Sequence, residues 1–259
     1  MGTIDETSAA RITALLEALA KPFEGSFDGL TVSEIARAVG RDKSSVSRQL
    51  KSLIELGLVE RDEFGKHVLG WRVFTLAARA GDRRLLSFAP PVMRQIGRQT
   101  EERIHLSIRR QDEVLTIHTE GPMRSVGAAG WVGRTVPLLG TSAGRALMVD
   151  DGEDEIRMIF DQYPRLVGGK NLPKSADETI FRVREARAKG YALTIDEHED
   201  GLAAIAAPIR DASGRIVAAI NISFPTVRLA GKTEEFSKLI HRAASHLSKS
   251  FATSRTGAN

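Results

Sequence analysis

The pattern from Thr31 to Gly70 constrains the fold of this chain most, because it predicts two short helices followed by a small hairpin. Thr31 and Glu34 have the spacing of a capping box, in which each side chain accepts a bond from the backbone N–H of the other residue. Gly40 can take the left-handed conformation that ends many helices. The sequence therefore predicts a first helix between Thr31 and Gly40.

The second helix has two sides of different chemistry. Asp42 can cap its N-terminus. Val46, Leu50 and Leu53 fall at the i, i+4, i+7 spacing of one buried stripe. The opposite side and its flanks carry small hydroxyls and long cations, which are Lys43, Ser44, Ser45, Ser47, Arg48, Lys51 and Ser52. Serine hydroxyls can bond phosphates or base edges, and an arginine can fork onto guanine. We predict that these seven residues bind DNA and that helix 43–55 enters the groove.

The segment after Gly57 has the pattern of a two-stranded wing. Residues 58–61 and 67–69 are predicted to form two short strands on either side of a turn that contains Gly65. Two capped helices followed by a wing favour a DNA-binding domain of the winged helix-turn-helix type. The alternative is a helical hairpin that packs onto another part of the protein and whose charges are merely solvated.

Composition limits the classes of protein to which the chain can belong. A length of 259 residues exceeds the usual size of one domain, so two domains are expected. The absence of cysteine excludes disulfides, thiolate metal sites and cysteine nucleophiles. The N-terminus lacks the apolar run of a signal peptide, and no stretch approaches the ~20 apolar residues of a membrane helix. We therefore expect a cytoplasmic protein without a membrane partner.

The positive charge of the chain is local. The net charge is +4, but residues 1–69 hold 9 Lys/Arg and 11 Asp/Glu, so the proposed DNA-binding domain carries −2. Within residues 37–51, one aspartate faces five cations, which are Arg37, Arg41, Lys43, Arg48 and Lys51. Phosphate attraction depends on where cations lie, so this cluster matters more than the sum over the domain.

Further helical patterns precede and follow the segment from Thr31 to Gly70. Ser8–Ala20 has an apolar stripe that completes a three-helix core, and the pattern from Trp71 to Ala80 predicts a helix that leads out of the hairpin. A boundary near Gly81 separates it from the rest. The predicted organisation is a DNA-binding domain at 1–70, a linker helix at 71–85 and a larger domain at 86–259.

The larger domain begins with a predicted short helix from Pro90-Pro91 to Thr100. Apolar residues then alternate along 103–110 and 114–119, which predicts a hairpin with one buried face. Further helices are expected at 154–160, 175–189 and 232–250, and further strands near 202–209 and 215–224. Helices on an antiparallel sheet make an α+β domain, so the fold class is a two-domain α+β protein.

Three blocks of sequence together resemble the IclR family of bacterial transcriptional regulators, over about residues 8–250. They are TVSEIARAVGRDKSSVSRQLKSLIELGLVERDEFGKHVLG at 31–70, GRTVPLLGTSAGRALM at 133–148 and AKGYALTIDEHEDGLAAIAAPIRDASGRIVAAINIS at 188–223. The resemblance implies a winged helix-turn-helix, a linker helix and a C-terminal GAF-like domain that binds an effector. It also implies a homodimer or homotetramer on palindromic, double-stranded operator DNA, with an organic or aromatic acid as the small-molecule effector.

The resemblance also implies where the effector lies. Matched by motif, the effector-binding positions are Val136, Leu138, Ser142, Ala143, Thr194, Leu202, Ala204, Asn221 and Ser223. Residues 141–144 would open a helix, and free amides at a helix start favour a carboxylate. The chain departs from the family pattern at several of these positions, Thr194, Ala204 and Asn221 among them, so the identity of the acid stays open.

Gly140 to Gly144 also fits G-x-S-x-G, which presents a nucleophilic serine in α/β-hydrolases and would make Ser142 catalytic. That class of enzyme needs parallel strands that alternate with helices, and this alternation is missing from the sequence. The alternative to a DNA-binding regulator is a GAF-like small-molecule-binding or hydrolytic module with a minor DNA-binding role. We predict no enzymatic activity and no cofactor.

Two groups of polar residues suggest metal chemistry less strongly. His105 and His118 could face each other across the first hairpin, but the six histidines have no recognisable ligand spacing, and packing or surface roles are favoured. The acidic run 196–200 is interpreted as a solvated loop. No metal site is predicted.

Overall fold

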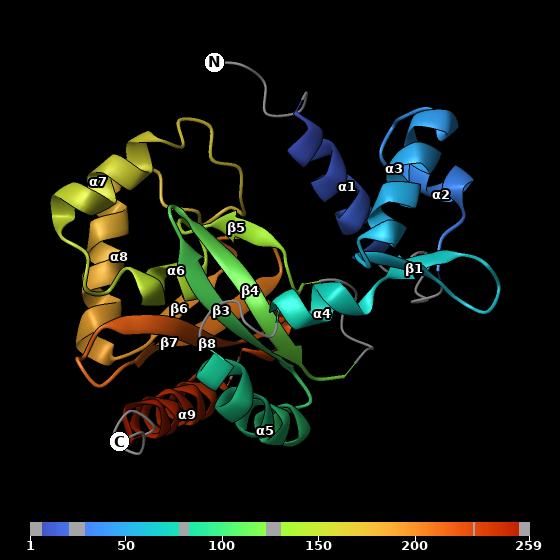
Figure 1. Cartoon of the computed structure of the whole chain (residues 1–259). Coiled ribbons are helices and arrows are strands. Elements are labelled where there is room, and N and C mark those ends of the chain that lie inside the picture. The colour runs from blue at the N-terminus through green and yellow to red at the C-terminus, as the bar shows by residue number, and fades with distance from the viewer. Residues whose placement is uncertain (1–6, 21–28, 78–82, 123–130, 230, 254–259) are drawn as a thin grey trace. The chain divides into compact units, whose positions relative to one another are not determined.

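The computed structural model describes residues 7–20, 29–77, 83–122, 131–229 and 231–253. The chain divides into two compact units, Met1–Arg83 and Arg84–Asn259 (Figure 1), and each is described by itself. Among the described residues, no helix combines the length and the apolar character that crossing a membrane requires. The predicted boundary at Gly81 and the end of the predicted helix, 78–80, lie outside the described residues.

The first unit is a three-helix core with a wing. Its elements are α1 (Ser8–Ala20), α2 (Val32–Ala38), α3 (Lys43–Glu55), β1 (Val59–Arg61), β2 (His67–Leu69) and α4 (Trp71–Ala77). The capping box of α2 is complete, because the Thr31 N–H donates to Glu34 and the Glu34 N–H donates to Thr31. The two predicted helices and the wing are confirmed, because α2, α3, β1 and β2 each form where the local sequence signal lies.

The buried stripe of α3 lies in the core of this unit. Val46, Leu50 and Leu53 are at most 1% exposed and pack with Leu15 and Ile35. Burying such side chains contributes roughly 1.5–3 kcal/mol each. The orientation of α3 is therefore fixed, and its polar side is turned outward.

The second unit has a six-stranded, fully antiparallel sheet in the order β5-β4-β3-β8-β7-β6. Its strands are β3 (Arg103–Arg110), β4 (Glu113–Glu120), β5 (Thr135–Pro137), β6 (Ala192–Ile195), β7 (Leu202–Arg210) and β8 (Ile216–Pro225). The edge strands β5 and β6 were not predicted. Pro137 ends β5, and an edge is where a strand tolerates proline, because the missing N–H faces away from the ladder.

Helices cover both faces of this sheet (Figure 1). They are α5 (Arg83–Thr100), α6 (Ser142–Leu147), α7 (Glu153–Asp161), α8 (Ala176–Lys189) and α9 (Thr233–Thr253). The helices α5 and α9 enclose an aliphatic core on one face, with Leu106 and Ile220 at its centre. The other three helices cover part of the opposite face. The rest of that face remains open to a cavity.

The prediction that a helix begins at Pro90 is wrong, because α5 begins at Arg83 and both prolines lie inside it. Prolines remove two helical hydrogen bonds, at a cost of about 3 kcal/mol each in a helix interior. Leu85, Ala89 and Met93 form one buried stripe that runs past the prolines onto the sheet. Packing of this stripe offsets the local cost.

Candidate functional site

The polar side of α3 is the first candidate site. Six of the seven predicted residues are exposed, and they are Lys43, Ser44, Ser47, Arg48, Lys51 and Ser52. Ser45 differs, because it is half-buried and accepts a hydrogen bond from Arg41 Nη2 at 3.0 Å. Arg41 also donates to Gln49 at 2.9 Å, so it braces the turn before α3.

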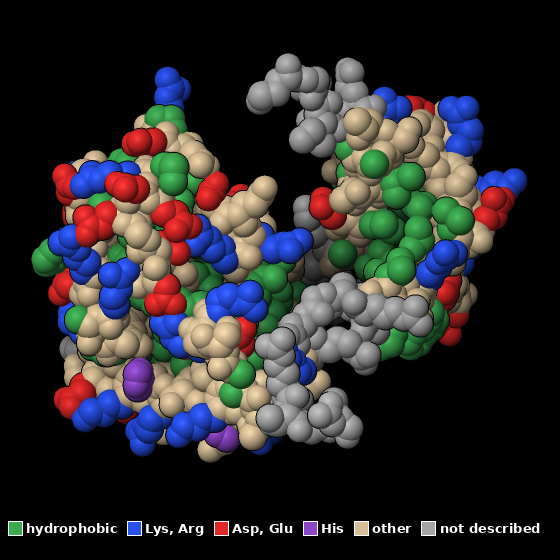
Figure 2. Space-filling view, turned by 60° about the vertical axis from the view of Figure 1, so that its left-hand side comes forward, with side chains coloured by type: hydrophobic (Ala, Val, Ile, Leu, Met, Phe, Trp, Pro, Cys, Tyr) green, Lys and Arg blue, Asp and Glu red, His purple; other side chains and the backbone are tan. Residues whose placement is uncertain are grey.

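The side chains along this surface are not equally available to a partner. Ser44 donates to the cap Asp42 at 2.7 Å, whereas the side chains of Ser47, Arg48 and Lys51 make no hydrogen bond or ion pair with other described residues. Exposed cations without an internal partner can neutralise phosphates at little cost. The surface of the second unit differs, since positive and negative side chains are interspersed over its visible face (Figure 2).

The second candidate site is a cavity of about 760 Å³ in the larger unit. Eight of the nine predicted effector positions line it, and they are Val136, Ser142, Ala143, Thr194, Leu202, Ala204, Asn221 and Ser223. Sheet register brings distant residues together, because Arg103, Ser223, Ala204 and Thr194 pair in one row across β3, β8, β7 and β6. The volume is within the usual range for small-molecule sites.

Leu138, the ninth position, does not line the cavity. Its side chain is fully buried in the core beneath α6. A Cβ at Gly144 would lie 2.0 Å from the Leu138 carbonyl oxygen, so the backbone at Leu138 lies directly against the helix. The side chain of Leu138 therefore lies in the core, whereas Val136, two residues before it, lines the cavity.

His105 lies in the polar floor of the cavity and was not predicted there. Its Nδ1 lies 3.0 Å from the Thr119 hydroxyl and its Nε2 lies 3.1 Å from the Ser223 hydroxyl. Burial, helped by the nearby charge of Arg103, lowers the pKa of His105 to about 4. The ring is therefore neutral near pH 7 and joins β4 to β8 as one donor and one acceptor.

Arginines and an aromatic ring complete the wall. Trp131 stands 5.5 Å from the ring of His105, and the Arg134 guanidinium lies 5.6 Å from the centre of the Trp131 ring. The lining residues that sequence reasoning missed include Arg103, His105, Ser107, Thr116, Trp131, Arg134 and Arg228. Alternation along residues 103–110 predicted a hairpin with one buried face, which carries Ile104 and Leu106. The opposite, polar face is buried as well at Arg103, His105 and Ser107.

The acidic run 196–200 is a solvated loop only in part, because Glu199 and Asp200 are exposed, whereas Asp196 and Glu197 are each 4% exposed. Glu197 accepts from Arg145 Nη2 and, at 2.9 Å, from Arg182 Nη1. Arg145 also donates to the Leu193 carbonyl at 2.6 Å. This cluster of Arg145, Arg182 and Glu197 ties α6 and α8 to the loop and to β6. Of these elements, α6, the loop and β6 supply residues to the cavity wall.

The serine of the G-x-S-x-G motif lacks the surroundings of a nucleophile. Ser142 is 3% exposed, and neither a histidine nor a carboxylate among the described residues is hydrogen-bonded to it. The sheet behind it has no parallel strands. The helix it opens has six residues, and the Thr141 hydroxyl already accepts from the Gly144 N–H, so the attraction of this helix for a carboxylate is weak.

The two histidines of the first hairpin do not face each other. His118 pairs with Leu106 across β3 and β4 and lies 3.2 Å from Glu120 Oε1, whereas His105 contacts Thr119 and Ser223. Within the part of the chain that the structure describes, no three histidine or acidic side chains gather as they would around a metal ion.

Comparison with known families identifies both units. The model of the bacterial transcriptional regulator IclR C-terminal domain matches residues 78–249, and that of the IclR helix-turn-helix domain matches residues 8–63. The HTH-type transcriptional regulator KdgR of Escherichia coli is 29% identical over 245 residues, covering 93% of this chain and 91% of that protein. The HTH-type transcriptional repressor AllR of Escherichia coli is 30% identical over 214 residues, covering 82% of this chain and 79% of that protein.

Solved structures share the fold. An IclR homologue from Microbacterium hydrocarbonoxydans, complexed with 4-hydroxybenzoate, superposes with a TM-score of 0.75 at 22% identity, covering 93% of this chain and 98% of that one. A transcriptional regulator from Rhodococcus sp. RHA1 superposes with a TM-score of 0.73 at 26% identity, covering 95% of this chain and 98% of that one.

Proposed function

The chain belongs to the IclR family of bacterial transcriptional regulators, and from this premise we propose how its two units bind DNA and a small molecule. It is a ligand-responsive, DNA-binding regulator. We assign DNA reading to residues 1–70, the connecting helix to 71–85 and effector binding to 86–259. The protein acts in the cytoplasm, where the operator lies, and performs no catalytic step.

The DNA contact is made by α3, and the observation that carries it is the exposed surface with Arg48 and Lys51. The helix inserts into the major groove, where Arg48 forks onto guanine and Lys51 neutralises a phosphate. The wing touches the backbone. Ser44, Ser47 and Ser52 are small enough to let the helix approach the groove closely.

A gel shift with the operator of the protein's own promoter tests this contact. The double variant Arg48→Ala/Lys51→Ala is expected to lose retention of operator DNA. Lys249→Ala is the matched control, because Lys249 is an exposed cation on α9. Retention by the double variant equal to that of the control would refute the assignment of α3.

Two copies of the DNA-binding unit act on one operator. A homodimer has two-fold symmetry, so its operator is palindromic, with half-sites one helical turn or a multiple of it apart. The assembly is a homodimer or, where two dimers pair, a homotetramer. Analytical ultracentrifugation of the whole chain, with and without operator DNA, tests both assemblies. A monomer on DNA would contradict them.

The effector is a small organic or aromatic acid that binds in the cavity. Arg103, Arg134 and Arg228 supply positive charge in the lining, while Val114 and Val136 supply apolar surface for a carbon skeleton. The solved neighbour with 4-hydroxybenzoate supports this class of ligand through the shared fold. To act as a switch, the acid must bind the DNA-competent and incompetent states with different affinity.

A thermal-shift screen of aliphatic and aromatic carboxylates, each beside its neutral amide, tests this class of ligand. Acids that fit raise the melting temperature, by mass action, and their amides do not. If every carboxylate leaves the melting temperature unchanged, the effector is not an acid.

A further inference from the structure

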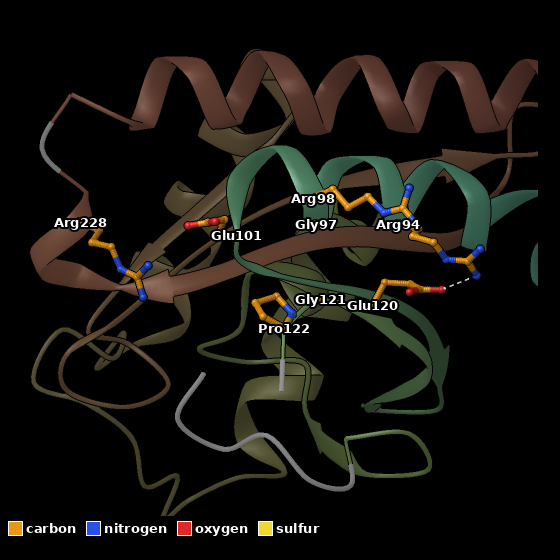
Figure 3. Close-up of a pocket in the computed structure, with 8 residues that line it drawn as sticks. All are labelled: Arg94, Gly97, Arg98, Glu101, Glu120, Gly121, Pro122 and Arg228. Atoms are coloured by element: carbon orange, nitrogen blue, oxygen red, sulfur yellow. Dashed lines mark hydrogen bonds and ion pairs between the residues drawn. The ribbon is translucent and has the colours of Figure 1, made fainter. Parts of the chain in front are cut away.

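Arg228 stands in the wall between two cavities. It ends the 3₁₀ turn Thr226–Arg228 that follows β8, and it lines both the effector cavity and a second cavity of about 710 Å³ beside α5 and β4. Figure 3 shows it across this second cavity from Arg94 and Arg98, next to Glu101. A side chain in this position can turn toward either space.

The present partner of Arg228 is a buried carboxylate with incomplete hydrogen bonding. Glu102 Oε1 accepts from Arg228 Nη1 at 2.8 Å, but the buried Glu102 Oε2 has no hydrogen-bond partner among the described residues. The Glu102 side chain is 3% exposed and that of Arg228 is 51% exposed. An unsatisfied buried oxygen is costly, so the pair is weaker than a fully bonded one.

The backbone holds Glu102 in place. Gly121 has a φ of +131°, and a Cβ there would lie 2.6 Å from the Glu102 carbonyl oxygen. The residue that follows β4 therefore lies directly against the backbone of Glu102, which fixes the point from which the buried Glu102 side chain extends. If the ion pair opens, Arg228 is the member that moves.

We propose that Arg228 binds the carboxylate of the effector and that Glu102 holds Arg228 until the effector takes it. This inference rests on the proposed acid-binding function of the cavity. A ligand carboxylate offers both of its oxygens to the planar guanidinium, whereas Glu102 engages it through one. The exchange replaces a poorly bonded ion pair by a bidentate one.

The other cations of the cavity fit this role less well. Arg103 is 6% exposed, and its place on β3 is fixed by the sheet. Arg134 stands against the face of Trp131. Arg228 is half-exposed and held by a side-chain carboxylate, which a ligand of the same chemistry can replace.

Glu102 can remain buried after Arg228 leaves. Burial and the neighbouring Glu101 raise the pKa of Glu102, and the charge of Arg228 opposes that rise. When Arg228 turns away, its charge no longer opposes the rise, so the pKa of Glu102 rises further and the neutral form that burial favours becomes easier to reach.

Calorimetric titration of the full chain tests the exchange with 4-hydroxybenzoate, D-gluconate and pyruvate, each beside its neutral amide. Glu102→Gln removes the competing charge but keeps an oxygen for Arg228, so the acid that binds wild type should bind about 3- to 10-fold more tightly. Arg228→Gln should weaken that acid about 10- to 100-fold. Arg98→Gln, which changes only the second cavity, should match wild type, and the amides should respond to none of the variants.

The outcomes separate the two proposals. Acid binding that is unchanged in both Glu102→Gln and Arg228→Gln overturns the exchange and leaves the acid-binding cavity standing. Weaker acid binding in Glu102→Gln also overturns it, because loss of a purely structural contact would have that effect. If none of the three acids binds wild type or Glu102→Gln, the exchange and the acid-binding cavity both fail. Circular dichroism of Arg228→Gln establishes that the variant is folded, and Arg228→Lys should restore part of the affinity.

Discussion

The two candidate sites place polar side chains in opposite surroundings. On α3, Arg48 and Lys51 are exposed and their side chains make no hydrogen bond or ion pair with other described residues, whereas Arg145, Glu197 and His105 in the larger unit are buried and bonded to one another or to neighbours. A charge in water costs little to keep and little to remove, but a buried charge depends on its partner. Substitutions on α3 should therefore change DNA binding alone, while substitutions around the cavity should change stability as well.

The largest expected effect tests the buried half of this comparison. Glu197→Ala leaves Arg145 and Arg182 without their shared carboxylate, and removing one member of a buried ion pair costs about 3–5 kcal/mol. Urea unfolding of the larger unit measures the loss. Glu234→Gln is the control, because Glu234 pairs with Lys238 at the surface and its loss should not be measurable. Equal, small effects of the two changes would show that burial is not what distinguishes them.

The next effect is a pH dependence that arises from His105. Its pKa in the folded state is lowered to about 4, below the ~6.5 of an unfolded histidine, so the unfolded chain takes up the proton first as pH falls. Stability is lost between about pH 6.5 and pH 4, by about 3 kcal/mol, and is constant above that window.

His105→Gln should remove this part of the acid dependence of unfolding, whereas His246→Gln, an exposed histidine on α9, should retain it. The comparison between the variants isolates His105, because the carboxylates of the protein are common to both. An unchanged slope in His105→Gln would mean that the ring is not buried as a neutral group.

The same contrast explains what the sequence could predict. The signals for α3 are local, since Asp42 and the stripe of Val46, Leu50 and Leu53 lie within twelve positions of one another. In the cavity, Arg145 and Glu197 are 52 positions apart, and their contact depends on how α6 packs against the loop. No pattern within either segment predicts this contact.

The alternation of polar and apolar residues also failed to distinguish a cavity from bulk water. Along β3 the alternation of polar and apolar residues predicted the strand correctly, but a polar face that lines a cavity has the same pattern as one that faces water. Thr194, Asn221 and Ser223 were predicted to bind the effector because of the resemblance to the IclR family, and not because of their spacing in the sequence. Their place in the cavity depends on cross-strand register, which the sequence alone does not display.

A smaller effect tests the exposed half of the comparison. Arg48→Ala should weaken operator binding by about 1–3 kcal/mol and relax base choice at one position of each half-site, if its contact with guanine is bidentate. Competition gel shifts with single-base operator variants measure both. The melting temperature of the free protein should stay at the wild-type value, because the side chain is exposed and makes no hydrogen bond or ion pair within the described part of the chain. A clear loss of stability would place Arg48 in the fold rather than in the DNA contact.

The smallest expected effect is that of Lys51→Ala. A lysine that neutralises one phosphate contributes to binding of every DNA sequence alike, since the backbone carries no sequence information. Its removal should reduce the slope of the logarithm of the binding constant against the logarithm of salt concentration by about 0.9 for each DNA-binding unit. Fluorescence anisotropy at several salt concentrations, with operator and with random duplex, measures the slope. A loss confined to the operator would make Lys51 a base-reading residue, and α3 would then read sequence through both Arg48 and Lys51.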